Sequence, residues 1–297
     1  MKKHVHNTKT IAWVVLLGVG VFLIALAISA ILSRYALSVS RYELREPGLT
    51  GAIRIVQLSD LHNSEFGKEN VRLTAKVAEQ EPDLILVTGD LLNENEEGTE
   101  VAVALIRKLA KIAPVYISYG NHEIGYERRF DTDLKELFSR AGAVVLDGTW
   151  EDVTVNGQEL RIGGIFGYCL SSVYLRTGEA RLRECAFLEA FLNTDRKTIL
   201  LCHMPVGWIL YGGLDGWNVD LVLSGHIHGG QVRLPWVGGL WAPDQGWFPG
   251  KCCGLYFSSD GVRAMVLTRG LGNTDKIPRL NNIPEILVLD LIPDQTT

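Results

Sequence analysis

The sequence predicts an α/β protein in which two mixed sheets pack together between outer helices, a four-layer α/β/β/α sandwich that follows one transmembrane helix. Three observations predict this architecture. Residues 53–141 alternate short apolar runs with segments of helical periodicity, which is typical of βαβ units. Two turn signals, Asn156-Gly157 and Asp260-Gly261, then indicate antiparallel hairpins. An uncharged apolar run near the N-terminus precedes all of these segments.

The apolar run from Ile11 to Leu32 is long enough to cross a membrane. At about 1.5 Å per residue it spans about 33 Å, and the hydrocarbon core of a bilayer is about 30 Å thick. Trp13 and Tyr35 lie near its two ends, where amphipathic aromatic residues favour the membrane interface. The alternative is a signal peptide cleaved at the small residues of positions 25–27. Because the run continues past that site, we expect an uncleaved anchor.

The basic residues around this run do not decide its orientation. Three lysines precede it and three arginines follow it before residue 50, so the positive-inside rule is balanced. The free amino terminus favours a cytoplasmic tail at residues 1–10 and a single-pass cell-membrane protein whose body is extracytoplasmic. Residues 33–50, which end soon after Pro47-Gly48, are expected to be a polar connector, and residues 51–297 to be the folded domain.

Strands and helices alternate in the first part of this domain. Strands are predicted at Ile53–Leu58, Leu84–Val87 and Val115–Ser118. The second of these is a continuous apolar run, which is typical of a strand buried in a parallel sheet. Helices are predicted at Glu69–Gln80, Val101–Ile112 and Asp131–Ala141. The last helix is expected to begin at Asp131 or Thr132 and to stop at Gly142.

More hairpins are predicted in the second part of the domain. Asn156-Gly157 joins the strands 152–155 and 159–165 by a type I′ turn, and Asp260-Gly261 joins 255–258 to 262–268. A helix is predicted at 181–192, and further strands at 198–202, 219–223 and 286–292. The pattern therefore changes from βα units to antiparallel pairs, and this change predicts mixed sheets.

Charge and cysteine content exclude some classes of function. The formal net charge is −5, and residues 1–50 carry +4, so the rest of the chain carries −9. An acidic body disfavours a broad nucleic-acid-binding surface. The five cysteines form no CxxC motif, so neither a disulfide framework nor a zinc finger is expected. We interpret them as reduced packing residues and assign no role to the pair Cys252-Cys253.

Residues that can bind metal follow five of the predicted strands. They are Asp60 and His62, Asp90, Asn121, His203, and the pair His226 and His228. Ligands of open α/β sheets gather at the carboxyl ends of strands. The chain has seven histidines. Two lie in the N-terminal tail, and the five others, His122 among them, all fall at strand ends beside Asp, Asn or Gly. Scattered core or surface histidines would not be distributed in this way.

This combination of carboxylate, amide and imidazole ligands suits Mn, Fe or Zn ions. Seven candidate ligands are too many for one ion and suit two ions that share a bridging ligand. Two such ions activate water and neutralise phosphoryl oxygens during in-line displacement at phosphorus. The residues therefore predict a dinuclear site that acts on a phosphate ester.

The motifs DLH, GD, GNHE, H and GHIH, in this order, resemble the calcineurin-like metallophosphoesterase superfamily over residues 51–292. The spacings of 30 residues from Asp60 to Asp90 and 31 to Asn121 are also similar to that superfamily. One branch, small and often membrane-anchored bacterial phosphodiesterase-like proteins, carries three further motifs. Here they are His228–Gln231, Arg269–Gly272 and Pro284–Ile286.

The resemblance implies a role for each position. One ion would be held by Asp60, His62 and His228, the other by Asn121, His203 and His226, and Asp90 would bridge both. His122 would not bind metal but would act as an acid or electrostatic stabiliser. Glu123 either orients His122 or is a solvated loop charge. Manganese is favoured, with iron or zinc as alternatives.

We therefore expect a membrane-anchored, dinuclear phosphohydrolase that cleaves a phosphodiester or pyrophosphate, either small or lipid-linked. The alternatives are a phosphomonoesterase and a non-catalytic protein-binding scaffold on the same fold. Five of the seven tryptophans lie between residues 208 and 247, several in the loop 234–250. They either pack a small core under this loop or form an apolar rim that enters the membrane interface or holds an acyl chain.

Overall fold

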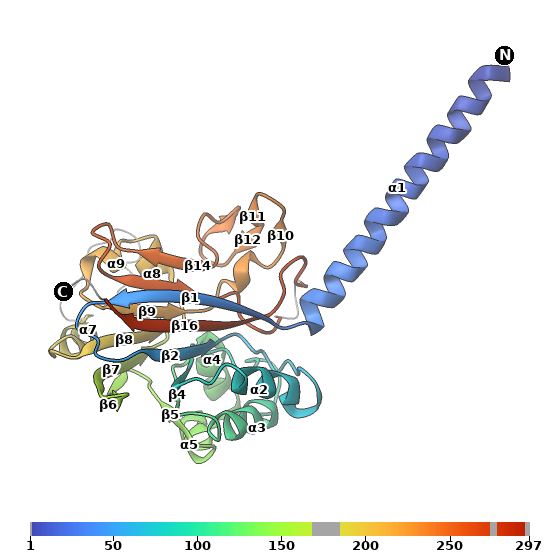
Figure 1. Ribbon diagram of the computed structural model, residues 1–297. Helices are drawn as coiled ribbons and strands as arrows, with labels where there is room; N and C mark the ends of the chain where they lie inside the picture. Colours follow the sequence, from blue (N-terminus) through green and yellow to red (C-terminus); the bar gives the residue numbers. More distant parts are fainter. Residues whose placement is uncertain (1, 168–184, 274–277, 295–297) are drawn as a thin grey trace.

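The computed structural model describes residues 2–167, 185–273 and 278–294, which form a body and one long projecting helix (Figure 1). The body contains two six-stranded sheets. The first has the order β1 (Ser38–Glu46), β16 (Glu285–Pro293), β2 (Ile53–Leu58), β3 (Leu84–Val87), β4 (Val115–Ile117) and β5 (Ala143–Val145). The second has the order β14 (Gly254–Phe257), β15 (Ala264–Leu267), β9 (Leu221–Ser224), β8 (Lys197–Cys202), β7 (Gln158–Ile165) and β6 (Thr149–Val155). Both sheets mix parallel and antiparallel pairs, as predicted.

The central strands are buried on both faces because each sheet has one face toward the other sheet and one toward helices. Side chains alternate along a strand. In β2, Ile53 and Ile55 therefore belong to the apolar cluster between the sheets, whereas Val56 and Leu58 belong to the cluster under the helices. Val222 of β9 lies in a third cluster, on the outer face of the second sheet.

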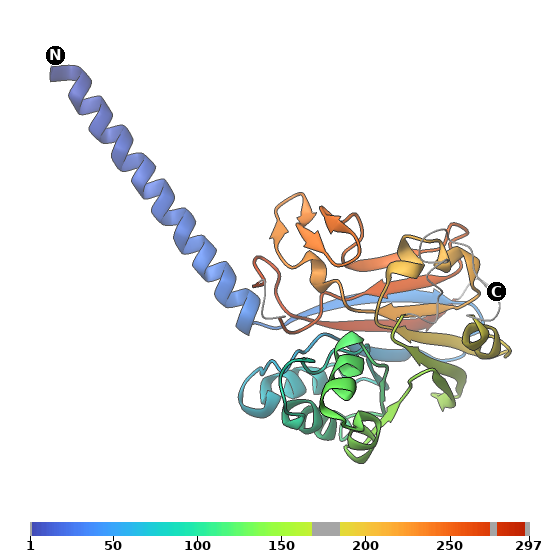
Figure 2. The same ribbon diagram turned by 180° about the vertical axis from the view of Figure 1, so that it is seen from behind.

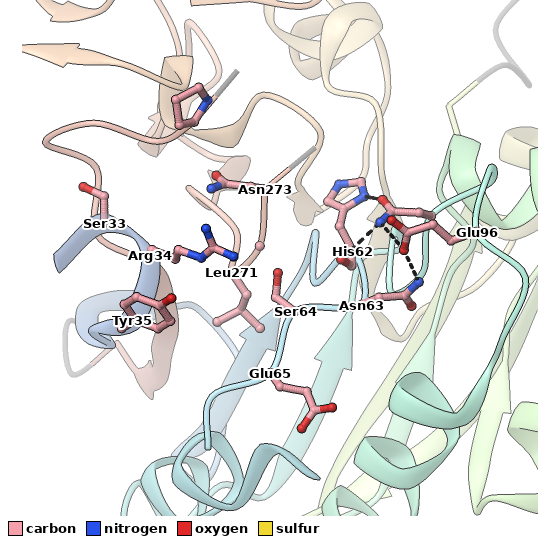
Figure 3. A pocket seen from close by; sticks show the side chains of 13 residues that line it. Ser33, Arg34, Tyr35, His62, Asn63, Ser64, Glu65, Glu96, Leu271 and Asn273 are labelled. Carbon is pink, nitrogen blue, oxygen red and sulfur yellow. Dashed lines mark hydrogen bonds between the residues drawn. The ribbon is translucent and has the colours of Figure 1, made fainter. Parts of the chain in front are cut away.

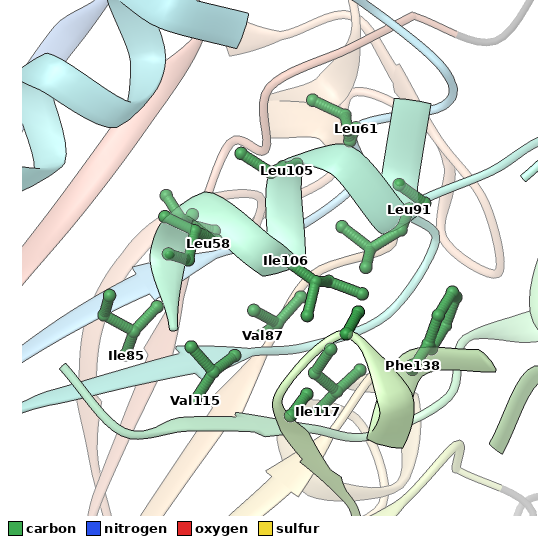
Figure 4. Close-up of a cluster of buried hydrophobic side chains, with 14 of the residues drawn as sticks. Leu58, Leu61, Ile85, Val87, Leu91, Leu105, Ile106, Val115, Ile117 and Phe138 are labelled. Atoms are coloured by element: carbon green, nitrogen blue, oxygen red, sulfur yellow. The ribbon is translucent and has the colours of Figure 1, made fainter. Parts of the chain in front are cut away.

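Helices cover both outer faces. The first sheet is covered by α2 (Val71–Ala78), α3 (Glu100–Leu109), α4 (Asn121–Phe130) and α5 (Leu134–Arg140), and the second by α7 (Ala186–Phe191), α8 (Val206–Ile209) and α9 (Gly213–Gly216). Figure 4 shows Leu105, Ile106 and Phe138 packed over Val87 and Ile117 of the first sheet. The predicted four-layer α/β/β/α sandwich is confirmed.

The expectation of a polar connector at residues 33–50 is wrong, because this segment contains β1. Residues 38–46 pair in parallel with residues 285–293 along the whole strand. β1 is an edge strand that alternates exposed charged residues with inward residues, and only Leu44 and Glu46 are buried. Its apolar signal is therefore weak, and its partner lies more than 200 residues away in the sequence.

Other predicted elements need smaller corrections. The Asn156-Gly157 hairpin is confirmed, since Val155 pairs with Gln158. Helix α5 begins later than predicted, because the side chain of Asp133 caps it by accepting a hydrogen bond from the Glu136 amide. Helix α4 was not predicted, because its sequence is mostly polar. The first residues of the helix predicted at 181–192 lie outside the described residues.

Helix α1 (Lys2–Tyr35) leaves the body at one end and projects away from it (Figures 1 and 2). Within Thr10–Tyr35, the most apolar 18-residue window has a mean hydropathy of 2.9, and none of this window is buried. The length and composition of this segment suit a membrane span or a signal sequence.

We predict that β1 is part of the folded domain. A chain that begins at residue 36 should keep the stability of the body, whereas a chain that begins at residue 47 should unfold at a lower temperature. The shorter chain loses the burial of Leu44, which is 4% exposed. It also leaves β16 as the edge strand of the first sheet, paired only with β2. Losing one buried leucine costs about 2 kcal/mol, or about 4–8 °C. Equal unfolding temperatures by circular dichroism would contradict this prediction.

Candidate metal centre

The eight residues singled out by the sequence lie at the edge of the body where the parallel strands of both sheets end. Strands β2, β3 and β4 run parallel, as do β8 and β9. The residues are Asp60 and His62 after β2, Asp90 after β3, Asn121 and His122 at the start of α4, His203 after β8, and His226 and His228 after β9. The two sheets therefore deliver side chains from opposite sides of one site.

These side chains form two groups that meet at one carboxylate. Within each group, one ligand-type atom of every residue lies within 4.8 Å of the others; the groups are Asp60, His62 and His228, and Asp90, His203 and His226. His62, Asp90 and His122 meet the same criterion and connect the two groups. The Oδ2 atom of Asp90 lies 3.1 Å from Nε2 of His203 and 3.7 Å from Nε2 of His62. Asp90 thus contacts both groups.

Two buried polar atoms at this site have no hydrogen-bond partner in the described part of the chain. They are Oδ1 of Asn121 and, in the neutral form of its ring, Nε2 of His203; when this ring is protonated, Nε2 pairs with Oδ2 of Asp90. The peptide between Asn121 and His122 is fixed, because the amide of His122 donates to Oδ1 of Asp90 over 2.9 Å. An unsatisfied buried acceptor is costly, and a bound cation would satisfy both atoms. The residues present therefore fit divalent metal ions.

Hydrogen bonds on the far side of two rings orient their Nε2 atoms toward the centre. Nδ1 of His203 lies 2.6 Å from the carbonyl oxygen of Thr88, and Nδ1 of His62 lies 3.0 Å from Oδ1 of Asn93. Both partners are acceptors, so each Nδ1 carries a proton, and in the neutral ring Nε2 has its lone pair for a metal. Nε2 of His62 and Nε2 of His228 lie 3.2 Å apart, with Asp60 beside them.

Burial and charge separate the pKa values of these imidazoles. Burial lowers the pKa of His62 to about 4 and that of His228 to about 3. Both rings are thus neutral near pH 7, as metal ligands must be. Burial also disfavours the charged form of His203, but the Asp90 carboxylate outweighs it and raises the pKa of His203 to about 9. Without metal, His203 therefore holds a proton that an incoming ion must displace.

The backbone turns sharply at the same positions. Left-handed φ angles occur at five of the candidate ligands: Asp60 (54°), His62 (46°), Asp90 (55°), His226 (71°) and His228 (50°). Such angles are uncommon outside glycine and cost free energy that the surrounding structure must supply. They turn the chain immediately after each strand and thereby direct neighbouring side chains into the site.

Two glycines allow the strand ends to approach one another. A Cβ atom on Gly120 would lie 2.2 Å from Oδ1 of Asp90, and one on Gly225 would lie 2.5 Å from Oδ2 of Asp60. No side chain fits at either position. The glycine that precedes Asn121 and the one that precedes His226 are therefore required by the close approach of a carboxylate from a neighbouring strand.

The two ring nitrogens of His122 lie in different surroundings. The backbone amide of Glu94 donates to its Nδ1 over 3.1 Å. The neutral ring therefore carries its proton on Nε2, which lies 4.0 Å from Oδ2 of Asp90. The side chain is 17% exposed, so a substrate can reach it.

Both interpretations of Glu123 from the sequence are wrong. The Glu123 side chain is fully buried, and it accepts hydrogen bonds from the backbone amides of Asp90, Leu91 and Gly120 at 2.7–2.8 Å. Burial raises its pKa to about 7. Glu123 therefore fixes the backbone around Asp90 and the start of α4, and it neither orients the His122 ring nor faces solvent.

Residues Arg269–Gly272, the RGLG segment, had no metal or catalytic role in the sequence analysis, and the structure shows that this segment supports the end of β2. The amides of Leu271 and Gly272 donate to the carbonyls of Ser59 and Asp60. Arg279, which the sequence analysis missed, is 2% exposed and donates to the carbonyl of Gly272 over 2.7 Å. Its Nη2 atom lies 3.2 Å from Nδ1 of His228. No local motif marks this arginine.

Asp244 is a second residue that the sequence analysis missed. It lies in the turn between β12 (Trp241–Ala242) and β13 (Gly246–Trp247), within the tryptophan-containing loop. Its Oδ2 atom lies 3.3 Å from Nε2 of His226. A carboxylate beside a ligating histidine commonly orients the ring and raises its basicity. The loop therefore reaches the metal centre through this contact.

Comparisons with known proteins agree with this geometry. The family model "Calcineurin-like phosphoesterase" matches residues 53–230. An uncharacterized metallophosphoesterase, YkuE of Bacillus subtilis, is 29% identical over 244 residues, which cover 80% of this chain and 78% of that protein. Phosphodiesterase YaeI of Escherichia coli is 29% identical over 246 residues, which cover 80% of this chain and 82% of that protein. An uncharacterized metallophosphoesterase of Campylobacter jejuni, Cj0846, is 30% identical, and the match covers 65% of this chain and 49% of that protein.

Proposed function

The chain belongs to the calcineurin-like phosphoesterase family, and on this premise we propose that it is a membrane-anchored, dinuclear phosphodiesterase or pyrophosphatase. The observation that carries the proposal is the position of Asp90 between two groups of ligand-type residues. One carboxylate with two oxygens can bind two ions at once. Retention of every candidate ligand argues against a non-catalytic scaffold.

Each group of residues would hold one divalent ion, with Mn²⁺ favoured and Fe or Zn as alternatives. Asp60, His62 and His228 would bind the first, Asn121, His203 and His226 the second, and Asp90 both. When bound, the two ions would supply Lewis acidity and an activated water for in-line displacement at phosphorus. The chain itself fixes the ligands, excludes bulk water from their inner faces and keeps His62 and His228 neutral.

His122 would stabilise the leaving group by donating a hydrogen bond from Nε2 to its oxygen. Its Nε2 proton is held in place by the hydrogen bond that Nδ1 accepts from the Glu94 amide. In diester cleavage, water adds to phosphorus and one P–O ester bond breaks; the departing alkoxide oxygen would accept a hydrogen bond from Nε2–H of His122 and take up the proton that the attacking water releases. The products are an alcohol and a phosphate monoester. The phosphodiesterase name of the Escherichia coli relative supports a diester substrate.

We also propose that α1 spans the membrane and that the body is extracytoplasmic. The tryptophan-containing loop 234–250 supports contact with a membrane. Trp236 and Trp247 in this loop are 103% and 69% exposed, whereas Trp208, outside it, is buried in the core. This loop lies near the end of α1, because the main chain and side chain of Asn281 bond to Ser29 of the helix and to Arg233. Exposed aromatic side chains beside a membrane anchor favour the interface.

The Asp90→Asn variant should lose at least about 10³-fold in activity while remaining folded. The amide cannot supply two anionic oxygens to two ions, and the lost charge stabilisation amounts to several kcal/mol. Hydrolysis of bis(p-nitrophenyl) phosphate and p-nitrophenyl phosphate would be measured with Mn²⁺, and Asp131→Asn, at an exposed position, is the matched control. Faster cleavage of the diester identifies a diesterase. Full activity in Asp90→Asn would refute the dinuclear proposal.

The His122→Ala variant should lose about 10²–10⁴-fold in kcat and retain two metal equivalents. A lower kcat with unchanged metal content distinguishes a hydrogen-bond donor from a metal ligand, because the loss of a ligand also releases metal. Metal content by atomic emission and kcat for the diester are measured on the same sample. A further check is a substrate with a better leaving group, for which the loss should be smaller. Loss of metal in parallel with activity would show that His122 is a ligand.

A reporter fused to the C-terminus tests the orientation. Alkaline phosphatase, which is active outside the cytoplasm, should be active in the fusion, and β-galactosidase, which is active inside, should be inactive. The physical reason is that one uncharged helix places the two ends of the chain on opposite sides of the membrane. The reverse result would place the body in the cytoplasm, and release of the protein into the soluble fraction would identify α1 as a cleaved signal sequence.

A further inference from the structure

A pocket of about 450 Å³ lies between the metal centre and the last turn of α1 (Figure 3). His62 and Asn93 line one side of it, and Arg34 and Tyr35 of the helix line the other. The volume lies in the range of small-molecule sites and exceeds the needs of one phosphate group. A molecule in this pocket would contact both the metal centre and the membrane-proximal end of the anchor.

Two carboxylates that line the pocket already accept hydrogen bonds from other groups of the protein. Glu65 accepts a hydrogen bond from the backbone amide of Glu69 over 2.8 Å. Glu96 accepts from the side-chain amides of Asn63 and Asn93, each over 2.9 Å.

Arg34, in contrast, has no acceptor among the residues that the structure describes, and its guanidinium lies 5.5 Å from the centre of the Tyr35 ring. Figure 3 shows its side chain directed into the pocket. Arg34 thus supplies an unpaired cation in a pocket of an otherwise acidic body. An anion is the complementary ligand for such a group.

The position of Arg34 is fixed by contacts between α1 and the body. Oγ of Ser29 accepts from the amide of Asn281 over 2.8 Å, and Oγ of Ser33 accepts from the amide of Asn282 over 3.0 Å. Arg72 donates to the carbonyl of Tyr35 over 3.2 Å. The last turn of the helix, Ser33–Tyr35, therefore forms part of the pocket wall.

The pocket lies at the level of the lipid head groups if α1 spans the membrane. Arg34 follows the apolar run by two residues, which is about 3 Å along a helix. A lipid whose chains remain in the bilayer would thus present its polar head to this wall. A water-soluble ester would gain nothing from this placement.

We propose that this pocket binds the polar head of a lipid-linked diphosphate, with one phosphate at the metal centre and an oxygen of the other bound by Arg34. The proposal rests on the phosphoesterase function and membrane anchor proposed above. Arginine suits the second phosphate because its planar guanidinium donates two parallel hydrogen bonds to phosphoryl oxygens. Arg34 would accordingly determine substrate specificity and would belong to the anchor helix rather than to the catalytic domain.

The test measures binding to the full chain, loaded with Mn²⁺ and inserted in phosphatidylcholine vesicles. The ligands are CDP-dioleoylglycerol and water-soluble CDP-glycerol, which share a diphosphate and differ in acyl chains. Kd is obtained from the ligand-dependent rise in unfolding temperature. The variants are Arg34→Gln, Arg34→Lys and Arg45→Gln; Arg45 is an exposed arginine that pairs with Glu43 and does not line the pocket.

Arg34→Gln should raise Kd for both ligands about tenfold. Arg34→Lys should recover part of this loss, and Arg45→Gln should bind like the wild type. The wild type should bind the lipid at least tenfold more tightly than CDP-glycerol. Unchanged binding in Arg34→Gln would overturn the role of Arg34, and equal wild-type affinity for the two ligands would overturn the lipid origin of the diphosphate. Failure of the wild type to cleave bis(p-nitrophenyl) phosphate would instead refute the phosphoesterase function, independently of these Kd values.

Discussion

The structure depends on the placement of two buried carboxylates, Asp60 and Asp90, at the junction of the two sheets. A buried ionised carboxylate costs several kcal/mol unless neighbouring charges or hydrogen bonds compensate it. Burial would raise the pKa of both groups, but His228 and His203 lower that of Asp60, and His203 and His62 lower that of Asp90. The same requirement for positive charge makes the site a receptor for divalent cations. Neutralisation of these two residues therefore links folding, metal binding and catalysis.

The surrounding structure is organised to hold these carboxylates in place. The strand ends adopt left-handed turns, and glycines at the neighbouring strand ends admit the carboxylates at distances that no side chain would permit. Glu123 binds the backbone on both sides of this junction. The RGLG segment in turn fixes the backbone after β2. Strain at the metal centre is thus balanced by hydrogen bonds from residues that do not bind metal.

The end of the body that faces α1 combines three features that are separate in the sequence. Helix α1 leads directly into strand β1, and β1 pairs with β16 along its whole length. The helix is therefore anchored to the first sheet through β1. The exposed aromatic loop reaches the metal centre through Asp244. The pocket between His62 and Arg34 lies at this same end. The fold therefore brings helix α1, the aromatic loop and the metal centre to one end of the body.

The sequence by itself determined the elements and residues whose signals are local. Apolar runs gave the central strands, the Asn156-Gly157 pair gave its hairpin, and the residue types that follow each strand gave the candidate ligands, because strand ends of parallel sheets converge. Only the tertiary structure decided the positions of β1, Glu123, Arg279 and Asp244. Each of these is fixed by a partner distant in sequence or by a backbone hydrogen bond, and neither leaves a periodic pattern in the chain. The same reason applies to Arg34, which reads as a charge that flanks an apolar helix until packing places it opposite His62.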